Sequence, residues 1–123
     1  MNKTIYIVAT PIGNLGDISL RAIEVLKTVD CILAEDTRRS RILLDHYGIK
    51  THMISFHKFN EKERLSKIQV LFNEYSQIAL ISDAGTPLVA DPGASLVEYA
   101  LNNKITIIPI PGASALTTLL SAS

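Results

Sequence analysis

The residues best suited to chemistry form one loop, Ser82 to Gly93, with the sequence SDAGTPLVADPG. The loop directly follows the apolar run Ile78 to Ile81 and precedes a predicted helix from Ala94 to Leu101. Open α/β proteins bind small molecules where buried strands end, in the crevice outside the carboxyl ends of parallel strands. The loop contains no Lys or Arg. A ligand there would therefore be held by backbone groups and small side chains, not by cations.

The residues of this loop differ in how strongly they favour ligand binding over an ordinary turn. Gly85 would let a ligand approach the backbone closely and Thr86 offers a hydroxyl, and the length of the loop favours binding for both. Asp83 could equally hydrogen-bond a ligand or cap nearby N–H groups. Asp91 is favoured as a helix N-cap, followed by Pro92 in the first turn.

A second group of reactive side chains follows the short apolar run at residues 31–34. Glu35 and Asp36 could act as a general base or orient a substrate there. A solvated surface is the alternative interpretation of these carboxylates. Arg38, Arg39 and Arg41 form the densest basic run of the chain, which fits contacts to phosphates or, with similar weight, an exposed helical face.

Two further turns contain glycine. Pro11 to Gly16 is not the dinucleotide fingerprint, because Pro11 stands where the first glycine belongs, and the chain has no phosphate-binding P-loop. Ligand contact and a simple turn are equally favoured there. Residues Pro111 to Ala115 would open a helix whose first N–H groups could meet an anion or a carbonyl, unless Ser114 caps them.

The three histidines do not have the spacing of metal ligands, so no metal site is expected. Only His57, next to Lys58, would lie at the predicted ligand edge.

The elements that must position these residues alternate regularly along the chain. Strands are expected at residues 5–9, 31–34, 52–56, 78–81 and 105–108. The first two helices are expected from the N-cap Ser19 to Thr28 and over 37–47, with Thr37 as cap and Gly48 closing the second helix. A third helix should follow an Asn60/Glu63 capping box and extend through Tyr75. Two more are expected over 94–101 and from Ala113 onward. This alternation predicts an α/β fold: a mostly parallel five-stranded sheet with helices on both faces. The residues after each strand should then gather at one edge of the sheet.

The bulk properties fit one soluble domain. The chain has 123 residues, 47% of them apolar, and no stretch approaches the about 18 apolar residues of a membrane span. Twelve basic residues balance twelve acidic ones, so the domain as a whole is not expected to attract nucleic acid. The single cysteine, Cys31, fits a reducing cytoplasm and a buried strand. The last predicted helix stops without a cap or polar tail, so we expect the chain to be part of a longer protein.

Four segments, in this order, resemble the tetrapyrrole methylase family, also called the class III S-adenosylmethionine-dependent methyltransferases. They are Val8–Asp17, Ala34–Arg38, Ser82–Gly93 and Ile110–Ser114. Within that family they look like the branch that modifies ribosomal RNA. The resemblance implies S-adenosyl-L-methionine as methyl donor and 2′-O-methylation of a cytidine ribose in the decoding region of 16S rRNA, within the small ribosomal subunit. A methylase of a tetrapyrrole or another small molecule, or a non-catalytic fragment, is the alternative.

The resemblance also implies a set of cofactor-binding residues. They are Pro11, Ala84, Gly85, Thr86, Val89, Ser114 and Ala115. Thr86 stands where relatives usually have an acid, and Ile12 replaces a glycine of many tetrapyrrole-modifying relatives, and both differences fit the rRNA branch. For catalysis, our hypothesis is that Glu35 or Asp36 orients or deprotonates the ribose hydroxyl while Arg38 holds phosphate.

The family's fold consists of two α/β domains with the cofactor between them. Residues 1–123 would be the N-terminal domain, and the isolated domain is expected to be inactive. The resemblance further implies a homodimer. The location expected from the single cysteine is the cytoplasm, and neither a membrane nor a metal is expected as a partner.

Overall fold

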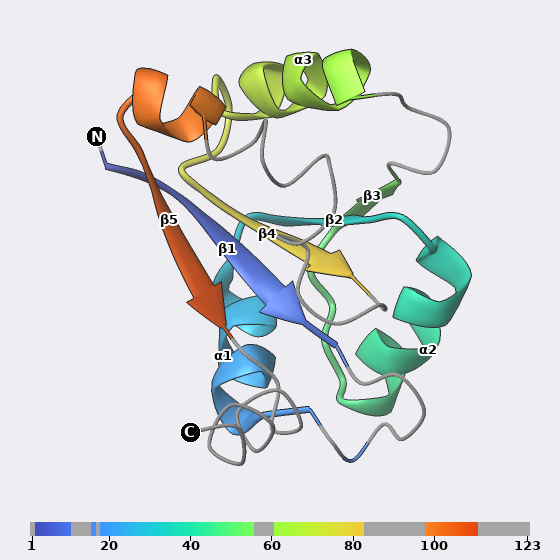
Figure 1. The fold of residues 1–123 in the computed structure, drawn as a ribbon. Helices are drawn as coiled ribbons and strands as arrows, with labels where there is room; N and C mark the ends of the chain where they lie inside the picture. Colours follow the sequence, from blue (N-terminus) through green and yellow to red (C-terminus); the bar gives the residue numbers. More distant parts are fainter. Residues whose placement is uncertain (1, 11–15, 17, 56–60, 83–97, 111–123) are drawn as a thin grey trace, which may run out of the picture.

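The computed structural model describes residues 2–10, 16, 18–55, 61–82 and 98–110. Five strands form one sheet in the order β3-β2-β4-β1-β5, and every neighbouring pair is parallel (Figure 1). The strands are β1 (Lys3–Ala9), β2 (Cys31–Ala34), β3 (Met53–Ser55), β4 (Gln77–Ser82) and β5 (Ile105–Ile110). The helices are α1 (Leu20–Thr28), α2 (Thr37–His46) and α3 (Glu61–Leu71), and residues 98–102 are also helical. The predicted α/β fold with a five-stranded parallel sheet is confirmed.

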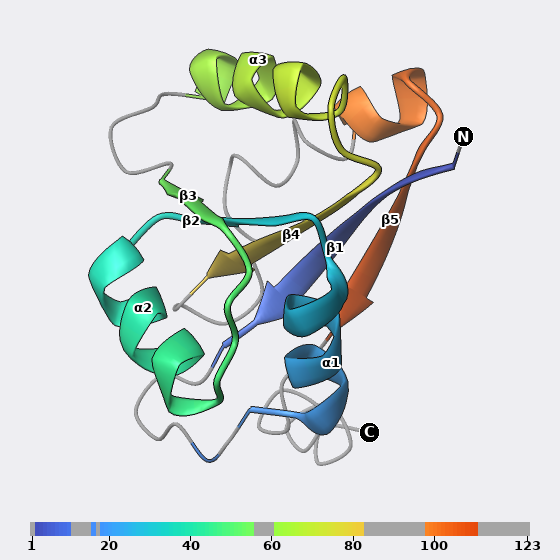
Figure 2. The same cartoon turned by 180° about the vertical axis from the view of Figure 1, so that it is seen from behind.

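Helices cover both faces of the sheet, as the unbroken apolar strands predicted (Figures 1 and 2). On one face, Leu26 of α1 and Leu44 of α2 pack against sheet residues such as Ile32. On the other face, Ile68 of α3 and Ala100 of the 98–102 helix belong to a second apolar cluster. The strand residues divide between the two clusters by alternation, and the sheet is therefore the middle layer of three.

Helix ends follow the expected local chemistry in two places. The Ser19 side chain accepts a hydrogen bond from the Ala22 backbone N–H at 3.1 Å, which satisfies a free donor at the start of α1. Beyond α2, Gly48 has a φ of +67°, a backbone conformation that residues with a side chain rarely adopt. Both features were predicted from the sequence.

Several element boundaries differ from the sequence predictions, among them those of β5, β3 and α3. β5 continues through Pro109 to Ile110, whereas the strand was expected to end at residue 108. β5 pairs with β1 alone and forms an edge of the sheet, where a proline without an N–H is tolerated. β3 is limited to Met53–Ser55, shorter than predicted, and α3 ends at Leu71 rather than at Tyr75. The predicted residues Phe56, Asn60, 94–97 and 113–123 lie outside the described part of the chain.

No helix within the described ranges is long and apolar enough to cross a membrane.

Cys31 lies at the start of β2 with no exposed surface, which confirms the prediction of a buried strand residue. Burial, and secondarily the negative charge of Asp30, raises the pKa of its thiol from 9.0 to about 11. We expect Cys31 to resist a disulfide reagent such as Ellman's reagent at pH 8 until the protein is unfolded by denaturant. Rapid reaction of the native protein would contradict this burial.

The same pKa difference predicts a pH dependence of stability. Above its ordinary pKa, the unfolded thiol loses its proton while the folded thiol keeps it up to about pH 11. The contribution of this group to stability is therefore complete below pH 9 and is lost as the pH rises towards 11. Denaturant titrations of the wild type and of Cys31→Ala across this range should show a smaller loss for the variant.

Candidate functional site

The carboxyl ends of β1, β4 and β2 lie side by side at one edge of the sheet. The register pairs Ala9 with Ser82 and Ala34 with Ile81, so the three strands end nearly level. The chain leaves β1 and β2 for α1 and α2 on one face, but from β4 it reaches the 98–102 helix on the other. Connections that diverge in this way open a crevice at the strand ends, where α/β proteins bind ligands. We call this expected binding position, at the ends of β2, β4 and β1, the crevice, and β4 is its middle strand.

Glu35 follows β2 directly, at the level of these strand ends. Its Oε1 accepts a hydrogen bond from Nη1 of Arg64 at 2.9 Å, and the two side chains form an ion pair. Arg64 belongs to α3, on the opposite side of the sheet from α2. About half of the Glu35 side chain is exposed, at 47%, whereas Arg64 is 17% exposed. Of the two carboxylate oxygens of Glu35, only Oε1 accepts a hydrogen bond from a residue in the described part of the chain. The ion pair thus fixes one oxygen of a carboxylate that is about half exposed.

Asp36 is the N-cap of α2. Its Oδ1 accepts hydrogen bonds from the backbone N–H groups of Arg38 at 3.1 Å and Arg39 at 3.2 Å. The sequence prediction that Thr37 caps this helix was wrong, because Thr37 is already the first helical residue and the longer side chain of Asp36 reaches the free donors. Asp36 therefore has a structural task that Glu35 lacks.

The capping role predicts a stability effect. Asp36→Ala should lower the free energy of unfolding by about 1 kcal/mol, because two backbone donors lose their acceptor. Asp36→Asn should leave it nearly unchanged, since an amide oxygen caps helices as well as a carboxylate. Urea titrations of the three proteins would test this. Equal losses in the alanine and asparagine variants would contradict the assignment.

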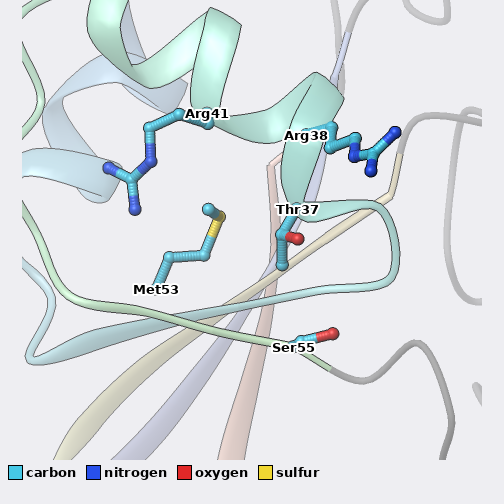
Figure 3. Close-up of a pocket in the computed structure, with 5 residues that line it drawn as sticks. All are labelled: Thr37, Arg38, Arg41, Met53 and Ser55. Atoms are coloured by element: carbon cyan, nitrogen blue, oxygen red, sulfur yellow. The ribbon is translucent and has the colours of Figure 1, made fainter.

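A shallow, open groove lies between α2 and β3, beside the crevice. Its volume is about 570 Å³ and its lining residues are Thr37, Arg38, Arg41, Met53 and Ser55 (Figure 3). In this view the guanidinium groups of Arg38 and Arg41 point in opposite directions, Arg41 above Met53 and Arg38 on the side of Thr37. Both arginines are exposed. Among the residues that the structure describes, neither forms an ion pair with a carboxylate.

The predicted catalytic residues are thus partly brought together. Glu35 and Asp36 lie at the edge of the crevice, and Arg38 begins the groove next to them. The predicted cofactor-binding residues all lie outside the described residues, as do Asp83, Asp91 and His57. They are Pro11, Ala84, Gly85, Thr86, Val89, Ser114 and Ala115.

Sequence reasoning did not find Arg64, Met53 or Ser55. Arg64 meets Glu35 across 29 positions of sequence, and no local pattern signals such a contact. Met53 and Ser55 fall within the predicted third strand, whose end was expected at the ligand edge, but their side chains were not singled out. Within the described ranges, no three His, Cys, Asp or Glu side chains are placed to hold a metal ion.

A family model described as Tetrapyrrole (Corrin/Porphyrin) Methylases matches residues 4–123. The chain belongs to the tetrapyrrole methylase family. It is 55% identical over 111 residues to Ribosomal RNA small subunit methyltransferase I of Mycoplasmopsis pulmonis, covering 90% of this chain and 50% of that protein. The chain spans about half the length of such curated relatives. It covers 42% of the protein of the same name from Mesorhizobium japonicum, for example.

Solved structures of this family share the fold. A uroporphyrin-III-C-methyltransferase from Thermus thermophilus superimposes with a TM-score of 0.73 at 19% identity, over 91% of this chain and 48% of that one. A structure of a Thermus thermophilus uroporphyrin-III C-methyltransferase complexed with S-adenyl homocysteine has a TM-score of 0.63 at 20% identity, over 89% of this chain and 48% of that one. These structures confirm the predicted α/β fold class of this chain.

Proposed function

We propose that the chain is the N-terminal domain of a two-domain, S-adenosyl-L-methionine-dependent methyltransferase of ribosomal RNA. The specific reaction we propose is 2′-O-methylation of a cytidine ribose in the decoding region of 16S rRNA, within the small ribosomal subunit. The observation that carries the proposal is the 55% identity to a ribosomal RNA small subunit methyltransferase I over 90% of the chain. The tetrapyrrole methyltransferases are far less similar, at 19% identity, and support the fold alone.

The crevice at the strand ends fits a cofactor of this kind. The residues that end β1, β2 and β4 are Ala9, Ala34 and Ser82, all of which are small. Bound S-adenosyl-L-methionine would supply an activated methyl group. Pro11 comes two residues after the end of β1, and the segment with Ala84, Gly85, Thr86 and Val89 begins two residues after the end of β4. The residues that the resemblance implies therefore follow the two strands at the centre of the crevice.

Ser114 and Ala115, the other two residues of this set, follow β5, which pairs with β1. The solved relative in complex with S-adenyl homocysteine supports the same class of cofactor.

For catalysis, the geometry favours Glu35 over Asp36. A ribose hydroxyl is a poor nucleophile, so a carboxylate that accepts its proton or its hydrogen bond would speed transfer. Arg64 holds one oxygen of Glu35, and the other can face the substrate. Asp36 instead caps α2 and orients the helix that carries Arg38. Arg38 then holds a phosphate of the substrate, and correct placement of the ribose supplies much of the acceleration.

The proposal includes the setting of the enzyme. A ribosomal substrate implies a cytoplasmic protein, and the family resemblance supports a homodimer. The spacing of the histidines favours an enzyme without a metal. The second domain would complete the cofactor site, and the chain of 123 residues alone would then be inactive.

Methyl transfer tests the proposal directly. The full-length protein should transfer tritium from labelled S-adenosyl-L-methionine to intact small ribosomal subunits and not to a porphyrinoid precursor. Nuclease digestion and chromatography should then identify a 2′-O-methylcytidine. Transfer only to the porphyrinoid would favour the tetrapyrrole alternative. Calorimetric titration of the cofactor into the full-length protein and into the 123-residue chain would show whether the second domain is needed, and no binding by either would refute a methyltransferase.

A further inference from the structure

The groove between α2 and β3 has the chemistry of a binding site for a charged strand. Arg38 and Arg41 lie three positions apart on α2, which places them on one face of the helix. Their guanidinium groups nevertheless point to opposite sides of the groove (Figure 3). Guanidinium groups that diverge in this way suit contacts to two separate anionic groups. Among the described residues, neither guanidinium forms an ion pair with a carboxylate.

One of the residues that line the groove, Met53, is apolar. Met53 is half-buried in β3 and lies beneath Arg41. A thioether is polarizable and makes favourable contacts with aromatic rings. The groove therefore combines two cations with an apolar surface that could receive a sugar or a base. A polyanion made of alternating phosphates and nucleosides fits this combination better than an acidic peptide does.

The position of the groove relates it to Glu35. Thr37, the first residue of α2, lines the groove and is two residues after Glu35. Ser55, the last residue of β3, pairs in the sheet register with Ala34 at the end of β2. The groove therefore begins at the strand-end edge that carries Glu35 and continues along α2 to Arg41.

We infer that this groove holds the single-stranded RNA next to the methylated nucleotide, with Arg38 and Arg41 contacting separate phosphates and Met53 contacting the sugar or base between them. The inference rests on the proposed function for the identity of the RNA. It adds Arg41 and Met53 to the substrate site. The RNA strand would then extend from Glu35 along α2 towards Arg41.

The salt dependence of RNA binding tests the inference. We would measure fluorescence anisotropy of a labelled single-stranded RNA, with the sequence of the 16S decoding region, against full-length protein at several salt concentrations. Each phosphate contact to single-stranded nucleic acid contributes about 0.7 to the slope of log affinity against log salt. Arg41→Ala should therefore reduce the slope by about 0.7 and weaken binding about tenfold at low salt.

Two matched variants keep the test specific. Arg41→Lys retains the charge and should retain the slope while losing part of the affinity, because lysine lacks the planar fork of arginine. Lys27→Ala removes one positive charge from the last turn of α1, which leads away from the strand-end edge, and should leave slope and affinity unchanged. Arg41 and Lys27 are both exposed, so all three variants should fold normally, as circular dichroism would verify.

The outcomes separate the groove from the proposed function. Equal slopes for the wild type, Arg41→Ala and Lys27→Ala would overturn the inference, even if the wild type methylates ribosomal subunits. Failure of the wild type to methylate any RNA would overturn the proposed function. The slopes would still decide whether the groove binds RNA.

Discussion

Glu35→Gln in the full-length protein is expected to lower kcat for methyl transfer by about 10²- to 10⁴-fold, the usual contribution of a positioned acid or base. The amide keeps the size of the side chain and an oxygen that can accept the hydrogen bond from Arg64. What it loses is the negative charge and the ability to take a proton from the ribose hydroxyl. The KM for the cofactor should change little, because Glu35 is proposed to act on the nucleotide.

Single-turnover transfer of a labelled methyl group to small ribosomal subunits would measure this effect without a contribution from product release. Asp36→Asn is the matched control, because it also neutralises one carboxylate yet preserves the cap of α2. Its kcat should remain close to that of the wild type. A normal rate for Glu35→Gln would exclude Glu35 as the base. A large loss in Asp36→Asn instead would move that role to Asp36.

The sequence predicted the centre of the sheet well because β1, β2 and β4 are short apolar runs that are largely buried. β2 is an example: its four residues, Cys31–Ala34, are all buried, and its observed bounds are the predicted ones. Errors occurred where tertiary context decides the boundary. Pro109 reads locally as the end of a strand, but its position in an edge strand allows the strand to continue.

The candidate site was predicted less completely, for a related reason. Glu35 could be singled out because it follows an apolar run, and parallel topology places all such residues at one edge. Its partner Arg64 comes from a helix on the other side of the sheet, so only the packed structure brings the two together. At α2, Asp36 and Thr37 are both good capping residues, and the choice between them depends on where the first helical turn begins.

Leu33→Ala is expected to lower the free energy of unfolding by about 2–5 kcal/mol, the largest effect on stability that we predict. Leu33 has no exposed surface and lies in β2, which pairs with both β3 and β4. Its side chain belongs to the cluster that joins the sheet to Ile68 and Phe72 at the end of α3. Truncation would remove buried apolar surface and leave a cavity that the neighbouring strands could close only in part. Urea unfolding monitored by circular dichroism would measure the loss.

Val70→Ala is the control, because Val70 lies on α3 but is 57% exposed, and its truncation should cost less than about 0.5 kcal/mol. Similar losses in the two variants would contradict the packing of α3 on this face of the sheet.

The same two variants also test the site, since Leu33 is two residues before Glu35 and α3 carries Arg64. If the Leu33 cluster holds α3 against β2, Leu33→Ala should slow methyl transfer even at temperatures where the protein remains folded. Val70→Ala should not, because it leaves the contact between α3 and the sheet intact.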